Sequence, residues 1–221
     1  MGPLTLVIGN KNYSSWSMRA WLLLRWLNLP FEEIVVSLYR EDSRANLLRY
    51  SPAAKVPVLI DGDLAIWDTY AIIDHLAESR PDIWPADRAK RAYARSITAE
   101  MHSSFNALRG TMSYNARGRN RRVPITPEVM SDIARAQDIW SDARTRFGSE
   151  GPYLLGDFGI ADILFAPVAV RFRTYGVDVR PDVADYWRTL LDHPLCREWF
   201  AAGEAEEEVI PVCELGGTDR I

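Results

Sequence analysis

Three serines lie within four positions near the start of the chain, Ser14, Ser15 and Ser17, with Trp16 among them. An apolar strand pattern (4–8) and a polar loop (9–13) precede them, and an apolar helix pattern, 18–27, follows. A helix that starts after such a turn leaves backbone N–H groups unpaired where its dipole is positive, and this favours anions. One serine is enough to cap a helix. We therefore expect a further hydroxyl to face a bound anion, the alternative being a purely structural role.

A second helix start also carries polar groups. Asp68 and Thr69 come directly after an apolar strand and before a helix pattern over 70–78. Either residue can cap that helix. Because both helix starts belong to the same small layer of strands and helices, we expect them to face one pocket.

The histidines and cysteines do not form a recognisable reactive set. His75, His102 and His193 are scattered, and Cys196 and Cys213 lie near the C-terminus without the spacing of metal ligands. We predict no metal site and no hydrolase triad. The cysteines are expected to be free thiols in a reducing cytoplasm, with a disulfide as the alternative.

The composition is that of a soluble globular protein: 221 residues, 48% of them hydrophobic and 25% charged. A net charge of −4 gives no electrostatic footprint for nucleic acid. Arg25 interrupts the longest apolar run well below the roughly 18 residues of a membrane span. The first residues lack a basic start and a cleavage site, so we expect a cytoplasmic protein without a membrane partner.

The first part of the chain predicts a βαβ-ββα domain over residues 1–80. Strand, helix and strand follow one another within about 35 residues, so the two strands (4–8 and 31–38) should be parallel. The apolar runs 58–60 and 64–67 flank Asp-Gly-Asp, a strong hairpin signal. Pro57 stands at the start of this hairpin, and a minority of such X-Pro bonds are cis.

The second part predicts an all-helical domain over 87–221, after a linker at 81–86 rich in turn-forming residues. Apolar spacings of three and four predict a long helix over 86–116 and another over 128–147. A strongly apolar helix over 156–169 should be the buried centre, and short helices are expected at 181–192 and 194–205. The run 117–122, with four arginines, is predicted to be a solvated connector. The tail after Glu206 is expected to be weakly ordered.

Together, these features resemble the glutathione transferase family over roughly residues 4–205. The most specific segments are Ser-Ser-Trp-Ser-Met-Arg (14–19), Lys-Val-Pro-Val-Leu (55–59) and Gly-Ile-Ala-Asp (159–162). The first is similar to the Ser-Ser-Cys-Ser motif of the zeta class, which includes maleylacetoacetate isomerases, except that Trp16 replaces the cysteine. The resemblance implies an α/β plus all-α fold: a thioredoxin-like N-terminal domain and a C-terminal helical bundle. It also implies glutathione as co-substrate and a homodimer.

The resemblance further implies roles for single residues. Ser14 would be the hydroxyl near the glutathione sulfur, with Ser15 as second candidate. Val56, before a cis Pro57, would pair its backbone with the cysteinyl unit as an added strand does. The γ-glutamyl end would be held by Asp68 and Thr69. Two further glutathione contacts are expected from Trp16 and Lys55, the latter near the glycine carboxylate. Asp162 would support folding, with Gly159 replacing the usual Ser or Thr.

The chemistry that this site would supply is acidification of a thiol. A free thiol has a pKa near 8.5, and lowering that value by two units takes about 2.7 kcal/mol. A charge-assisted hydrogen bond from a serine is worth roughly 1.5 to 3 kcal/mol, and the helix start adds about 0.3 to 1 kcal/mol. These contributions suffice without a metal. We therefore predict a glutathione transferase whose thiolate attacks a small hydrophobic electrophile.

Two other functions remain as alternatives. A maleylacetoacetate-type isomerase needs a basic group for a dicarboxylate, and Arg171 and Arg173 lie near the segment where the zeta class places an arginine, although Thr174 occupies the aligned position. A catalytically inactive scaffold would use the arginine run, 117–122, as its partner surface. The substrate pocket is expected between the serine loop and the long helix, where the alternative is ordinary core packing; its predicted residues are Tyr13, His102, Phe105, Arg109 and Met112.

Overall fold

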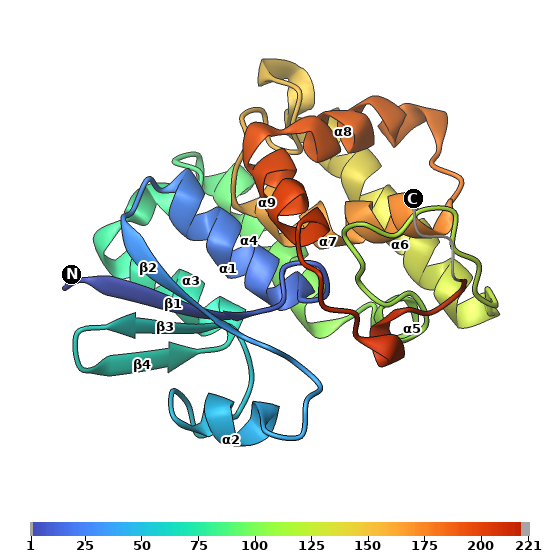
Figure 1. Ribbon diagram of the computed structural model, residues 1–221. Helices are drawn as coiled ribbons and strands as arrows, with labels where there is room; N and C mark the ends of the chain where they lie inside the picture. Colours follow the sequence, from blue (N-terminus) through green and yellow to red (C-terminus); the bar gives the residue numbers. More distant parts are fainter. Residues whose placement is uncertain (1, 218–221) are drawn as a thin grey trace.

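The computed structural model describes residues 2–217, and its N-terminal part has the predicted βαβ-ββα order (Figure 1). The sheet has the strand order β2-β1-β3-β4; β1 and β2 are parallel, and the other two pairs are antiparallel. The elements are β1 (Leu4–Gly9), α1 (Ser15–Trp26), β2 (Phe31–Val36), α2 (Ser43–Leu48), β3 (Val58–Asp61), β4 (Leu64–Trp67) and α3 (Thr69–Ser79).

Side-chain alternation along β1 determines which helices cover each face of this sheet. Leu6 and Ile8 belong to the large core that includes α1 and α3, whereas Val7 packs with Leu47 of α2 in a smaller cluster. Successive side chains of a strand point to opposite faces. Both faces of β1 are therefore buried, and its end at Gly9 leads directly to the start of α1.

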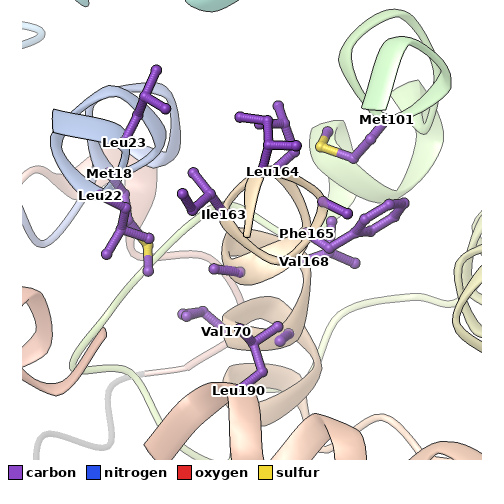
Figure 2. Packing of buried hydrophobic residues seen from close by; sticks show 14 of the residues in the cluster. Met18, Leu22, Leu23, Met101, Ile163, Leu164, Phe165, Val168, Val170 and Leu190 are labelled. Atoms are coloured by element: carbon purple, nitrogen blue, oxygen red, sulfur yellow. The ribbon is translucent and has the colours of Figure 1, made fainter. Parts of the chain in front are cut away.

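The C-terminal part is helical throughout, with α7 at its centre. Its elements are η1 (Pro81–Ile83), α4 (Arg88–Ser103), α5 (Asn106–Thr111), α6 (Pro127–Phe147), η2 (Gly148–Glu150), α7 (Ile160–Tyr175), α8 (Pro181–Asp192), α9 (Pro194–Glu204) and η3 (Pro211–Cys213). Every α7 residue except Arg173 is buried. Figure 2 shows Ile163 and Leu164 of α7 between side chains of α1, including Leu23, and Met101 of α4. The expectation of a buried central helix is confirmed.

Two helix boundaries differ from the prediction. The long helix expected over 86–116 is wrong, because α4 ends at Ser103 and Phe105 adopts a left-handed backbone conformation with φ of 61° before α5 begins. The apolar spacing continues across this break, so periodicity alone does not reveal it. The helix expected over 156–169 begins only at Ile160 and runs to Tyr175.

The start of α7 is held by a buried carboxylate. Asp162 is 1% exposed and accepts hydrogen bonds from the backbone N–H of Leu154 (3.1 Å) and of Gly159 (3.0 Å). Burial raises the pKa of Asp162 to about 7, although these N–H donors favour the ionised form. Gly159 has no side chain to cap the helix, and the hydrogen bonds that the Asp162 carboxylate accepts from the preceding turn replace this cap.

The arginine run is not the solvated connector predicted from its charge. Arg121 is 3% exposed and forms an ion pair with Glu214. Arg117 donates to the carbonyl oxygens of residues 206 (2.5 Å) and 208 (3.0 Å). Arg119 donates to Glu204 at 3.2 Å. A scaffold function therefore loses most of the exposed charge on which its partner surface depended, since only Arg122 of the four arginines is exposed.

The tail after Glu206 is likewise packed against the body of the protein, contrary to the expectation of weak order. The Glu206 carboxylate accepts from the backbone N–H of Lys11 (2.6 Å) and of Asn12 (3.0 Å), in the loop before the serines. Ile210 and Cys213 are 3% and 7% exposed. The two cysteines are free thiols, as predicted. Within residues 2–217, no helix is long and apolar enough to cross a membrane.

Replacing Arg121 with Gln should lower the free energy of unfolding by about 2 kcal/mol, because the half-buried Glu214 loses its closest cation and keeps only Arg117 at 3.9 Å. Arg122→Gln is the matched control: Arg122 is exposed, and we expect a change within about 0.5 kcal/mol. Urea unfolding measures both. Equal stabilities of the two variants would show that the Arg121–Glu214 ion pair contributes nothing to the stability of the fold.

The raised pKa of Asp162 predicts that stability falls as pH rises from about 4 to about 7. In this window the native state keeps a proton that the unfolded chain releases, so the loss is at most about 1.4 kcal/mol per pH unit. The side chain of the Asp162→Asn variant cannot titrate, so the stability of this variant should not show this part of the decrease with pH. Urea unfolding at a series of pH values compares the two slopes; identical slopes would mean that Asp162 titrates normally.

Candidate active site

The start of α1 is tied to the end of β1 through two serines. Ser14 is the N-cap, and its Oγ accepts from the backbone N–H of Ser17 at 3.2 Å. It also donates to Ser17 Oγ at 2.7 Å, which in turn accepts from the Gly9 N–H at 3.0 Å. Ser17 is fully buried. Although Ser17 is part of the recognised motif, no pattern in the sequence assigned it a role of its own.

Ser15 lies one residue further into the helix and faces the helical domain. Its Oγ accepts a long contact of 3.4 Å from Arg171 Nη2, and its backbone carbonyl accepts from Arg19 Nη1 at 3.2 Å. Ser15 is 7% exposed. The two candidate hydroxyls therefore have different surroundings: Ser14 is bonded within the helix cap, and Ser15 is beside a cation.

Three arginines surround Trp16 and Ser15. The guanidinium carbons of Arg19 and Arg109 lie 4.4 Å and 5.3 Å from the centre of the Trp16 ring. Arg19 and Arg171 are 0% and 4% exposed. Their bonds go mainly to carbonyl oxygens, such as Arg19 Nε to Leu164 at 2.9 Å.

These cations make the helix start strongly positive. Among residues 2–217, no carboxylate pairs with Arg19 or Arg171. Burial, and then the charges of Arg171 and Arg109, lower the pKa of Arg19. Burial lowers the pKa of Arg171 to about 10. An anion bound here would relieve this repulsion and would also meet the positive end of the helix dipole.

A cavity of about 720 Å³, here called the serine cavity, opens between the two halves of the chain at this point. Its size is within the range of small-molecule sites. Side chains from both halves contribute to it, including Tyr114 and Cys213 from the second. The predicted site residues that line it are Tyr13, Ser14, Ser15, Trp16, Lys55, Val56 and Arg109.

The remaining predicted glutathione contacts lie beside β3 and at the start of α3. The Val56–Pro57 peptide bond is cis. Asp68 caps α3 by accepting from the Tyr70 N–H at 2.8 Å, and its φ of 77° is an unusual backbone conformation for this residue type. Thr69 is 2% exposed, and its Oγ1 has no hydrogen-bond partner within the described part of the chain. Since buried hydroxyls normally have a partner, this atom is a candidate ligand contact.

The structure does not bring all the predicted pocket residues to the serine cavity. Phe105 and Met112 are 3% and 0% exposed and belong to the core. Their helical spacing reflected packing rather than a pocket. His102 lies beside the start of α3, with Nε2 3.4 Å from Asp68 Oδ2 and its ring 5.1 Å from that of Trp16. Burial lowers the pKa of His102.

Several residues of the site were not predicted from the sequence. The sequence contains an indication that Arg19 belongs to the site, because it is a charged residue within an otherwise apolar helix pattern. It contains no such indication for Ser113 and Cys213, because they reach the cavity only when the loop and the tail fold against each other: Ser113 Oγ donates to the Cys213 carbonyl at 2.7 Å. The tail also fixes Tyr13, whose hydroxyl donates to Glu214 at 2.5 Å.

The chain thus combines a βαβ-ββα domain and a helical domain, with an anion-favouring cavity between them. Comparison with models of known protein families identifies the class of protein that has this arrangement. The model of the glutathione S-transferase N-terminal domain matches residues 13–79, and that of the C-terminal domain matches residues 92–202. The chain belongs to the glutathione S-transferase family.

Individual relatives agree with this assignment. A probable maleylacetoacetate isomerase of Caenorhabditis elegans is 36% identical over 76% of this chain and 78% of its own length. The maleylacetoacetate isomerase of Rattus norvegicus is 25% identical over 76% and 77%. Among solved structures, a glutathione transferase homologue from Burkholderia with bound glutathione has a TM-score of 0.68 and 25% identity, and the match covers 92% of this chain and all of that one.

Proposed function

We propose that this transferase uses the Ser14 hydroxyl, at the start of α1, to hold the glutathione sulfur as a thiolate. The observation that carries the proposal is the Ser14–Ser17 hydrogen bond at the wall of the serine cavity. A hydroxyl proton can rotate, and a serine oxygen has two acceptor sites. When a thiolate binds, Ser14 can therefore donate to the sulfur while Ser17, which already accepts from the Gly9 N–H, donates to Ser14.

Other groups of the site suit the rest of the tripeptide. At the start of α3, the orphaned Thr69 Oγ1 and the Asp68 carboxylate can hold the γ-glutamyl end. Val56 lines the cavity directly before β3, so its backbone can pair with an extended peptide. Lys55 offers a positive charge to the glycine carboxylate. The glutathione bound by the Burkholderia homologue supports the same co-substrate here.

The arginines add to thiol acidification. Opposite charge near an ionisable group favours its charged form, and this effect is strong where water is excluded. Arg171 and Arg19 are buried next to Ser15. They therefore supplement the Ser14 hydrogen bond and the helix start, and glutathione is activated without a metal or a histidine.

The same arginines restrict the second substrate. Arg109 and Arg171 reach the serine cavity from the helical domain, so we infer that the electrophile carries a carboxylate on its otherwise hydrophobic body. Arg173 does not line this cavity, and Thr174 is buried and donates to the Asn115 carbonyl at 2.9 Å. Arg171 is the cation available for this role. Because two relatives are named as maleylacetoacetate isomerases, cis–trans isomerisation of an unsaturated dicarboxylate is the second candidate reaction.

The serine proposal is tested with Ser14→Ala and Ser15→Ala, by calorimetry with glutathione and by ultraviolet absorbance of the thiolate. Ser14→Ala should bind glutathione but raise the pKa of the bound thiol, and lower kcat/KM roughly 10- to 100-fold, the value of one charge-assisted hydrogen bond. Ser15→Ala is the neighbouring control and should change the pKa of the bound thiol and kcat/KM much less. The reverse pattern would assign the role to Ser15, and no glutathione binding by wild type would refute the function itself.

Arg171→Met should change KM for an acidic electrophile more than KM for a neutral one. We expect KM for maleylacetoacetate to rise about tenfold or more, since a buried charge-assisted contact is lost. KM for the neutral 1-chloro-2,4-dinitrobenzene should change much less. The ratio of the two values is the readout, because it is insensitive to a general loss of folded protein. An unchanged ratio would show that Arg171 does not contact the electrophile.

A further inference from the structure

A second cavity, separate from the serine cavity, lies against the outer helices of the helical domain. It has a volume of about 500 Å³, and its lining residues come from α7, α8, α9 and the arginine run. Its lining includes Arg119, Arg173, Arg188 and Arg197, together with Trp187 and Phe200. None of these residues lines the serine cavity.

Aromatic rings give this second cavity flat apolar walls. Trp187 donates its indole N–H to the Ala169 carbonyl at 3.0 Å, so the ring is held in place and its polar group is already used. The guanidinium of Arg173 lies 4.4 Å from the centre of the Phe200 ring. A planar ring can stack on such surfaces, where aromatic contacts contribute beyond the burial of apolar area.

The charges of the second cavity are unbalanced. Four arginines line it, against the two carboxylates Asp192 and Glu204. Arg119 is paired with Glu204 at 3.2 Å, whereas Arg173 and Arg197 form no ion pair within residues 2–217. The imbalance leaves two guanidinium groups available to a bound anion.

Arg173 is also incompletely bonded. Its Nη2 donates to the Ala116 carbonyl at 2.6 Å, but its Nε is buried and has no acceptor among the described residues. Burial, and then the charge of Arg119, lower the pKa of Arg173 to about 10. An incoming anion would supply the missing acceptor and reduce the repulsion between the two arginines.

We propose that this second cavity binds a small molecule that carries a flat aromatic ring and a phosphate group. Arginines reach the cavity from the arginine run, α7 and α9, so their N–H groups approach from different directions. A phosphate offers several oxygens to such donors, whereas a carboxylate offers two oxygens in one plane. The ring of the ligand stacks against Trp187, because the guanidinium of Arg173 already lies against the Phe200 ring.

Calorimetry with adenosine 5′-monophosphate tests the proposal, with adenosine and inorganic phosphate as the separated halves of that probe. The monophosphate should bind at least about tenfold more tightly than either half, because only it uses both the rings and the arginines. Binding should weaken with added salt. If adenosine binds as tightly as the monophosphate, or if no binding occurs at millimolar concentration, the proposal is wrong.

Two variants locate the binding. Arg197→Gln changes an exposed side chain and should weaken binding of the monophosphate about fivefold, while the exposed Arg122→Gln outside the cavity should leave it unchanged. In nitrogen–proton NMR spectra, the indole resonance of Trp187, assigned with Trp187→Phe, should shift on addition of the monophosphate. Equal affinities of the two arginine variants, or an unmoved Trp187 resonance, would overturn the proposal. Glutathione turnover should be the same in both arginine variants.

Discussion

The contact between α1 and α7 is the constraint on which the rest of the structure depends. One side of helix α1 packs against the sheet. The opposite side packs against α7, the central helix of the other domain. The α1 residues from Ser17 to Leu24 are accordingly all buried. Arg19 lies in the middle of this contact, and its Nε bond to the Leu164 carbonyl joins the two helices directly. The two domains therefore share one core, and the position of α1 fixes the position of both serines.

This arrangement explains why the candidate site is at the junction of the domains. The end of β1 and the start of α1 face the beginning of the loop that follows α5, where Asn12 accepts from the Ala116 N–H at 2.9 Å. The tail then closes the same region through Glu206 and Glu214. A cavity with one wall from each domain results. Under the proposed function, the first domain would provide the glutathione contacts, and the second would determine which electrophile fits.

The parts of this arrangement that the sequence predicts are those with local causes. The Asp-Gly-Asp turn, the polar loop before the serines and the apolar stretch of α7 each determine their own backbone. The resemblance in motif order adds only proposed roles for Val56, Pro57 and Thr69. The break at Phe105 was missed because the apolar spacing continues across it. The burial of Arg121 was missed because its partner, Glu214, is 93 residues further along the chain. Charge composition indicates solvent exposure only when no distant carboxylate is available.

The buried arginines beside the start of α1 lower the stability of the fold, and a bound anion would offset part of this loss. Desolvating a charge costs several kcal/mol unless hydrogen bonds and an opposite charge compensate for it. Arg19 and Arg171 have carbonyl oxygens as partners but no carboxylate in the described part of the chain. A carboxylate placed among them would stabilise the fold, yet it would also neutralise the potential that favours a thiolate. The described part of the chain thus leaves these buried cations without a partner carboxylate, which is consistent with a site whose natural occupant is an anion.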